Sequence, residues 1–198
     1  MGELCLRDPI PIPNTAVSVP RLGFGVYQLY SSSCQQAVGA ALDAGFRHVD
    51  SAQLYRNESE VGAAVRHSAL RRRDVFLTTK MMVGAAGSPD KTYRDALDSV
   101  DRMGGYVDLF LVHLPGPSRE AREELWRALE RLHDEGKAKA IGVSNFRIQH
   151  LEEMRDYARV WPPHVNQLEL HPWCQQRELV RFCRDNGIVL QAYSPLSC

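Results

Sequence analysis

The sequence predicts an α/β fold of the (β/α) barrel type, with about seven strands and six helices. Short apolar segments rich in strand-forming residues recur from residue 22 onward, and amphipathic segments separate them. Some of the apolar segments are hydrophobic almost throughout, which is typical of parallel strands covered on both faces. Strict alternation of strand and helix then gives a parallel sheet with right-handed crossovers. The predicted strands are residues 22–27, 46–50, 75–79, 107–112, 138–143, 164–169 and 188–193.

The first twenty residues are predicted to form an N-terminal hairpin. Its two strands are residues 10–12 and 16–19, and Asn14 and Thr15 form the turn between them. We expect this hairpin to cover the bottom of the barrel. Residues 1–20 contain four prolines and no long apolar stretch, so they indicate neither a signal peptide nor a membrane span. We therefore expect a cytoplasmic protein.

The helices are predicted from their end signals and apolar stripes. Ser88 is a candidate N-cap, Pro89 suits the first helical turn, and Gly104 can end the helix that they begin. Ser118 and Gly136 bound the next helix in the same way. An earlier helix carries an apolar stripe before Gly45, another begins near Asn57, and a later one begins near Arg147.

A closed barrel is favoured over an open doubly wound sheet. An open sheet that binds a dinucleotide is expected to show a glycine-rich fingerprint after its first strand. The chain has only Gly23 and Gly25 there, with no third glycine. The sequence therefore predicts a barrel-type sheet in a single domain over residues 1–198.

Composition excludes several classes of partner. The chain has 198 residues, no net formal charge and 44% hydrophobic residues, which is enough for one domain with a sizeable core. The longest basic run, residues 71–73, is interpreted as a solvated turn rather than a binding patch, so neither nucleic acid nor a membrane is expected as a partner. The five cysteines show no metal-binding spacing, and we interpret them as reduced thiols.

Four polar side chains follow the C-terminal ends of predicted strands, where a (β/α) barrel carries its chemistry. They are Asp50, Tyr55, Lys80 and His113. A free phenol has a pKa of about 10, and a neighbouring ammonium is expected to lower it by stabilising the tyrosinate. Asp50 would hold Lys80 charged, and His113 would hydrogen-bond a carbonyl oxygen. This group can protonate a carbonyl oxygen while its carbon is attacked.

Each of these residues taken alone also has a structural interpretation, as a turn cap, a rim residue, a solvated lysine or a core histidine. Their common location at one rim favours the chemical interpretation. A metal-dependent hydrolase is a further alternative, with His48, Asp50, His113 and His171 as ligands. The strand ends offer no pair of histidines two residues apart, so this alternative depends on spacing alone and no metal is expected.

Several segments resemble the aldo-keto reductase family. Residues 45–58 are similar to its first signature, with Asp50 and Tyr55 in register, and residues 135–146 to its second. The lysine and histidine strands of the family are matched by residues 78–80 and 107–113, and two further matches are residues 165–172 and 191–196. The resemblance extends over essentially the whole chain from Leu22.

The resemblance implies that the chain reduces an aldehyde or ketone with NADPH. Tyr55 would deliver the proton, Lys80 and Asp50 would tune it, and His113 would orient the substrate. The implied cofactor-binding residues are Gly25, Asp50, Ser144, Asn145, Gln167, Tyr193, Ser194 and Leu196. Asn145, Ser144 and Gln167 would bind the nicotinamide carboxamide, and Tyr193 would stack on the ring. As alternatives, Ser144 and Asn145 could cap the following helix and Tyr193 could be rim packing.

The substrate pocket would include His113 and Tyr27, although Tyr27 could equally be rim packing. The family barrel has eight strands, whereas this sequence provides seven, so the eighth strand and two helices are missing. We expect exposed strand edges and possible self-association there. An alternative function is a catalytically weak or inactive subunit that binds the cofactor and regulates another protein.

Overall fold

The structure is a computed structural model that describes residues 8–82 and 87–196. Its main sheet contains seven parallel strands in the order β3-β4-β5-β6-β7-β8-β9, so strand order follows chain order. The predicted fold class, an incomplete (β/α) barrel of seven strands, is confirmed. The strands are β3 Phe24–Gly25, β4 His48–Asp50, β5 Phe76–Met81, β6 Val107–Val112, β7 Ala138–Ser144, β8 Val165–Glu169 and β9 Val189–Tyr193.

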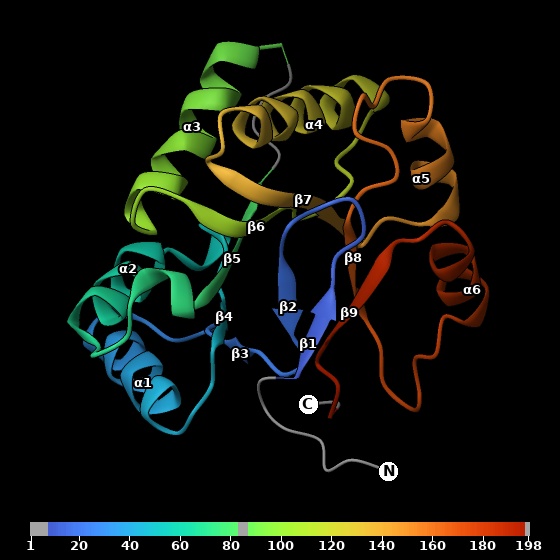
Figure 1. Cartoon of the computed structure of the whole chain (residues 1–198). Helices are drawn as coiled ribbons and strands as arrows, with labels where there is room; N and C mark the ends of the chain where they lie inside the picture. Colours follow the sequence, from blue (N-terminus) through green and yellow to red (C-terminus); the bar gives the residue numbers. More distant parts are fainter. Residues whose placement is uncertain (1–7, 83–86, 197–198) are drawn as a thin grey trace.

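Within these described residues, six α-helices form an outer layer around the curled sheet, and Figure 1 shows this layer. Each follows one strand, as the sequence predicts. They are α1 Ser31–Asp43, α2 Glu58–His67, α3 Pro89–Arg102, α4 Arg119–Asp134, α5 Ile148–Met154 and α6 Arg177–Asp185. The described residues also contain two short 3-10 helices, η1 Gln53–Tyr55 and η2 Arg72–Asp74.

Alternate residues of the strands face two different cores. On β6, Phe110 and Val112 pack in the cluster beneath the helices, whereas Leu109 and Leu111 pack in the cluster inside the curl. Successive side chains of a strand point to opposite faces, so a strand buried on both faces is apolar throughout. The residues at the upper, inward-facing ends of the strands are therefore directed into the barrel mouth.

The N-terminal hairpin lies against the inside of the curl. Strands β1 (Pro9–Pro11) and β2 (Ser18–Pro20) pair antiparallel, and Figure 1 shows them in the middle of the ring of strands. Ile12 and Val19 are 2% and 4% exposed and pack with Leu109, Leu111 and other inward residues. These apolar contacts close the end of the barrel opposite to the strand C-termini.

Most helix ends follow the predicted signals. The side chain of Ser118 accepts a hydrogen bond from the Ala121 backbone N–H, which confirms it as the N-cap of α4. Gly45, Gly104 and Gly136 all have positive φ after their helices, a conformation that glycine adopts without strain. Ser88 does precede α3, but its side chain makes no capping hydrogen bond.

The basic run at residues 71–73 is only partly solvated. Arg72 pairs with Asp108 at 2.9 Å and its guanidinium lies over the Tyr106 ring, so the interpretation as a solvated turn is wrong for this residue.

Among residues 8–82 and 87–196, no helix is both long and apolar enough to cross a membrane.

Candidate active site

The sheet brings four of the sequence-predicted residues together at the C-terminal ends of neighbouring strands. Asp50 ends β4, Lys80 lies one residue before the end of β5, and His113 directly follows β6. Tyr55 ends η1, the 3-10 turn that follows β4. Parallel pairing of β4, β5 and β6 puts these strand ends at the same edge, which is why residues far apart in the chain become neighbours.

Lys80 and Asp50 form a buried ion pair. The lysine side chain is 2% exposed and the aspartate side chain 16% exposed. Lys80 Nζ also donates to the backbone carbonyl of Ser51 at 3.1 Å, and Gln167 Nε2 donates to Asp50 Oδ2 at 2.8 Å. A buried charge is stable only when it is paired and hydrogen-bonded, and these contacts meet that need for both ions.

Tyr55 lies against both the ammonium and the imidazole. Lys80 Nζ is 5.1 Å from the centre of the Tyr55 ring, and the His113 ring centre is 5.8 Å away with the rings nearly perpendicular. Burial raises the pKa of Tyr55 above its ordinary value, while the charge of Lys80 opposes that shift. The expected net lowering is therefore wrong, because burial outweighs the ammonium. The phenol keeps its proton at neutral pH.

His113 is held in its neutral form. Burial, together with the nearby charge of Lys80, lowers the pKa of His113 to about 4, and Asp50 only partly offsets this. Its Nδ1 is buried and makes no hydrogen bond within the part of the chain that the structure describes. A neutral imidazole carries one N–H, so it can donate a hydrogen bond to a carbonyl oxygen without adding a charge.

A second group of predicted residues is hydrogen-bonded together on β7, β8 and β9. Ser144 Oγ donates to the Gln167 carbonyl at 2.9 Å, and Asn145 Nδ2 donates to Ser144 Oγ at 3.0 Å. The Tyr193 hydroxyl donates to Asn145 Oδ1 at 2.9 Å. Through Gln167 and Asp50 this group connects to the ion pair. Hydroxyl and amide groups around a partly exposed aromatic ring suit an aromatic ligand with an amide substituent.

Ser144 and Asn145 do not act as caps for the next helix. The N-cap of α5 is Arg147, whereas the Asn145 side chain donates to the His113 carbonyl at 3.1 Å. Asn145 also has a left-handed φ of 63°, a conformation that asparagine tolerates better than most residues. Its amide is thus turned toward the barrel mouth and joins the two groups of residues.

Other predicted site residues lie around this centre with fewer contacts. Gly25 is opposite Asp50 in the β3–β4 register, and an added Cβ would meet no atom within 4 Å. Tyr27 is 61% exposed, and its ring centre is 5.0 Å from that of Tyr55. Ser194 has a φ of 47°, and Leu196 is 89% exposed. Within the described part of the chain, no hydrogen bond, ion pair or ring contact joins Ser194 or Leu196 to the other site residues.

Three further residues connect the site, and the sequence analysis assigned them no role. Ser51 accepts the bond from Lys80, Gln191 Oε1 accepts one from Gln167 Nε2 at 2.8 Å, and Asn57 joins two loops at the rim. Gln191 shares the inward face of β9 with Tyr193, two residues later, so strand periodicity could have found it. Ser51 acts through its backbone carbonyl, which no side-chain pattern reveals.

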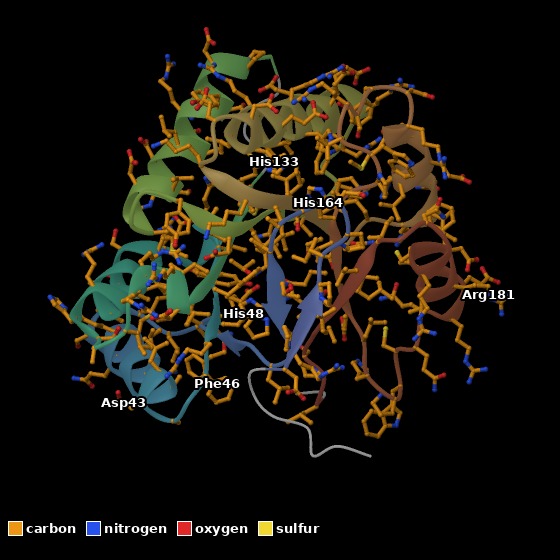
Figure 2. The ribbon with its side chains drawn as sticks, viewed as in Figure 1. Asp43, Phe46, His48, His133, His164 and Arg181 are labelled. Atoms are coloured by element: carbon orange, nitrogen blue, oxygen red, sulfur yellow. The ribbon has the colours of Figure 1, made fainter. Side chains whose placement is uncertain are left out.

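The four residues of the metal alternative do not form a ligand group. His48 Nε2 is 2.9 Å from the Thr78 hydroxyl, and His171 Nε2 is 3.0 Å from Glu169. Figure 2 shows His48 beside the N-terminal hairpin, and it begins β4, the strand that Asp50 ends. Within the residues that the structure describes, no three His, Cys, Asp or Glu side chains are grouped to hold a metal ion.

A surface hollow lies elsewhere, between the N-terminal turns of α5 and α6. It is lined by apolar surface, with Leu179 among its residues, and by side chains of both charges, Arg147, Glu152, Arg177 and Glu178. Its charges balance and it contains none of the rim residues above. The chemistry of the rim therefore identifies the candidate active site, and this hollow does not.

Comparison with known proteins shows which family the chain is similar to. The sequence model of the aldo/keto reductase family matches residues 21–198. The chain is 42% identical over 189 residues to an aldo-keto reductase of Mycobacterium sp. (strain JLS), covering 95% of this chain and 68% of that protein. It is 38% identical over 197 residues to the glyoxal reductase of Bacillus subtilis (strain 168), covering 96% and 68%.

A solved structure shows the same architecture. The crystal structure of an aldo/keto reductase from Brucella melitensis matches with a TM-score of 0.88 at 41% identity, covering 96% of this chain and 74% of that one. The chain spans 64% to 68% of the length of the curated relatives compared with it.

Proposed function

Because the chain belongs to the aldo/keto reductase family, we propose that it reduces an aldehyde or ketone to an alcohol, with NADPH as the reductant. The observation that supports this most directly is the position of Tyr55, whose ring lies close to both the buried Lys80 ammonium and the neutral His113 ring. A carbonyl oxygen at this point would have a proton donor and a hydrogen-bond donor beside it.

Tyr55 is the proposed proton donor. Its raised pKa keeps the hydroxyl protonated, which is the form that an acid needs. As the carbonyl carbon accepts hydride, the oxygen becomes an alkoxide and a much stronger base than a phenolate, so proton transfer from Tyr55 is favourable. The bound nicotinamide would supply the hydride. Lys80 would stabilise the tyrosinate that remains, and Asp50 would hold Lys80 in place.

His113 is proposed to orient the substrate. With a pKa of about 4 it is neutral at physiological pH, so it would donate a hydrogen bond to the carbonyl oxygen. Holding that oxygen beside Tyr55 fixes the geometry of proton transfer. Tyr27 would form one wall of the substrate pocket, since its ring lies beside that of Tyr55.

The cofactor would be held by residues of β7, β8 and β9. Gln167 Oε1 accepts no hydrogen bond from the described residues, so it is available to a carboxamide N–H, and Ser144 and Asn145 supply further polar groups. Tyr193 would offer its ring for stacking. Gly25, Asp50, Ser194 and Leu196 complete the proposed cofactor set, and the preference for NADPH follows from the family resemblance alone.

A second candidate is a subunit that binds the cofactor without useful turnover. The proposed carboxamide-binding residues and Tyr193 are hydrogen-bonded to each other independently of Tyr55. Binding would therefore survive in a protein whose proton donor is ineffective. NADPH binding without consumption of any carbonyl compound would favour this candidate.

The experiment is to replace Tyr55 by phenylalanine and measure NADPH oxidation with aromatic and aliphatic aldehydes. Loss of the general acid should lower kcat/KM by about 100-fold or more. Cofactor binding, followed by fluorescence titration, should be nearly unchanged. Tyr157→Phe is the matched control, because that hydroxyl is buried without a hydrogen-bond partner in the described part of the chain. Full activity of Tyr55→Phe would refute the assignment.

A further inference from the structure

Asn57 is a buried asparagine that does not serve its own helix. It is the N-cap of α2, a position at which asparagine usually accepts a bond from the first turn of the helix. Here its side chain makes no capping bond, and the residue is 0% exposed. Its amide is instead directed across the rim to the loop that follows β3.

The amide makes three hydrogen bonds to two different loops. Nδ2 donates to the Val26 carbonyl at 2.8 Å and to the Leu29 carbonyl at 2.9 Å. Oδ1 accepts from the Ser51 hydroxyl at 2.7 Å. Both amide protons and the oxygen are thus used, so replacing Asn57 would leave buried polar groups on both loops without a partner.

The two carbonyls belong to the tight turn that carries Tyr27. The Leu29 N–H donates back to the Val26 carbonyl at 3.2 Å, and Gln28 within the turn has a left-handed φ of 63°. Glutamine pays an energetic cost in that conformation, so the turn needs external support to persist. The Asn57 amide provides it by holding the first and last carbonyls of the turn.

The same residue is tied to the catalytic side of the site. Asn57 lies two residues after Tyr55. The backbone carbonyl of its partner Ser51 accepts a hydrogen bond from Lys80 Nζ at 3.1 Å. One buried amide therefore links the Tyr27 turn to the strand end that holds the ion pair. The ring centres of Tyr27 and Tyr55 are 5.0 Å apart, with the ring planes tilted by 53°.

We propose that Asn57 is a positioning residue that fixes the distance between Tyr27 and Tyr55 and thereby selects which carbonyl substrates fit. This inference rests on the proposed reductase function, in which Tyr27 forms a wall of the substrate pocket. Loosening the turn would weaken contacts with bulky aromatic substrates and leave the proton donor in place. We therefore expect loss of the Asn57 amide to raise KM for large substrates and to change kcat much less.

The test uses the full chain with Asn57→Asp and the milder Ser51→Ala. Asn57→Asp keeps the size and the acceptor for Ser51 but loses both donors to the turn. Backbone hydrogen exchange followed by NMR should show the Leu29 amide exchanging about tenfold faster or more, since two hydrogen bonds are lost. The Val26 amide, which donates to the Asp50 carbonyl, should change less. Ser51→Ala should give a smaller change in the same direction.

Steady-state kinetics supply the second readout. For Asn57→Asp, KM for benzaldehyde should rise about tenfold, KM for propanal much less, and kcat should stay within about threefold of the parent value. Asn166→Asp is the control, because Asn166 is an equally buried amide that donates to a different loop, at the Phe146 carbonyl. It should leave Leu29 exchange and the ratio of the two KM values unchanged.

Two outcomes would overturn the inference. Unchanged Leu29 exchange in a folded Asn57→Asp variant would show that the amide does not hold the turn. An equal fall of kcat for both aldehydes, with unchanged KM, would place its role at Tyr55 instead. If neither parent nor variant consumes aldehyde, the proposed function fails, while hydrogen exchange still decides whether Asn57 positions the turn.

Discussion

At the scale of single residues, the site is a buried ion pair with neighbours that use its charge. Lys80 is almost fully enclosed, yet it has the Asp50 carboxylate and the Ser51 carbonyl as partners. The ammonium limits how far burial raises the pKa of Tyr55 and helps to keep His113 neutral. Compared with burial alone, the Lys80 ammonium therefore weakens the preference of Tyr55 for its protonated form. It strengthens the preference of His113 for its neutral form.

Removing one member of this pair should cost stability. Lys80→Met leaves the Asp50 carboxylate largely buried with fewer donors, so we expect the free energy of unfolding to fall by about 3 kcal/mol. Adding Asp50→Asn to that variant should recover much of the loss. Urea denaturation of the two single variants and the double variant measures the coupling.

An exposed ion pair provides the control. Lys91 and Asp95 lie on the surface of α3 with side chains 64% and 45% exposed, so Lys91→Met should change stability by less than about 1 kcal/mol. Equal losses for Lys80→Met and Lys91→Met would contradict the assigned role of burial.

At the scale of elements, helix packing depends on a few close approaches. Gly62 of α2 lies against the end of α3, where an added Cβ would be 2.1 Å from the Arg102 carbonyl oxygen. The Glu58 side chain of the same helix is 2% exposed and pairs with the Arg102 side chain at 2.7 Å. The α2 helix that follows Tyr55 is thus fixed to its neighbour by a backbone contact and an ion pair.

Two glycine substitutions should therefore have opposite effects. Gly62→Ala forces α2 and α3 apart and should destabilise the protein by about 1–3 kcal/mol. Gly39→Ala in α1 meets no atom within 4 Å and should stabilise it by about 0.5–1 kcal/mol, because alanine has the higher helix propensity. Thermal and chemical denaturation of both variants tests this. A stabilising Gly62→Ala would mean that the helices adjust without cost.

At the scale of the whole molecule, the curled sheet buries several histidines in neutral form. Burial is the main cause that lowers the pKa of His48, His113 and His164 to about 4. His164 lies beside His133, with ring centres 5.4 Å apart, and Figure 2 shows both near α4 and β7. His164 Nδ1 accepts the Ile141 backbone N–H at 3.0 Å, and a protonated ring would lose that bond.

Stability should consequently fall in mild acid. The ordinary histidine pKa of about 6.5 applies to the unfolded chain. Between pH 6.5 and about pH 4 the unfolded chain therefore binds protons that the folded chain does not, and each such histidine lowers stability by up to about 1.4 kcal/mol per pH unit. Urea denaturation between pH 7 and pH 5 measures this slope, above the range in which the carboxylates titrate.

Single variants separate the contributions. His164→Asn can still accept the Ile141 N–H, because its amide oxygen takes the place of Nδ1, and it should reduce the slope by up to one proton. His67→Gln, at an exposed position at the end of α2, is the control variant. Stability that stays flat from pH 7 to pH 5 would show that these histidines titrate alike in the folded and unfolded chain.

The sequence by itself determined the alternation of strands and helices and placed Asp50, Tyr55, Lys80 and His113 at strand ends. These features depend on local periodicity, caps and turn residues, which act over a few positions. The observed strands agree with the predicted ones, and Ser118 caps the helix that it was predicted to cap.

Tertiary structure alone decided which side chains meet. The bond between Gln167 and Asp50 joins residues 117 positions apart. The sequence around Asn57 is that of a helix cap, but its side chain hydrogen-bonds to the loop after β3. The net pKa shift of Tyr55 follows from its burial rather than from its sequence neighbours. Such contacts depend on how the sheet curls, and such pKa shifts depend on how much hydration each side chain loses on burial. Neither is encoded in a local sequence pattern.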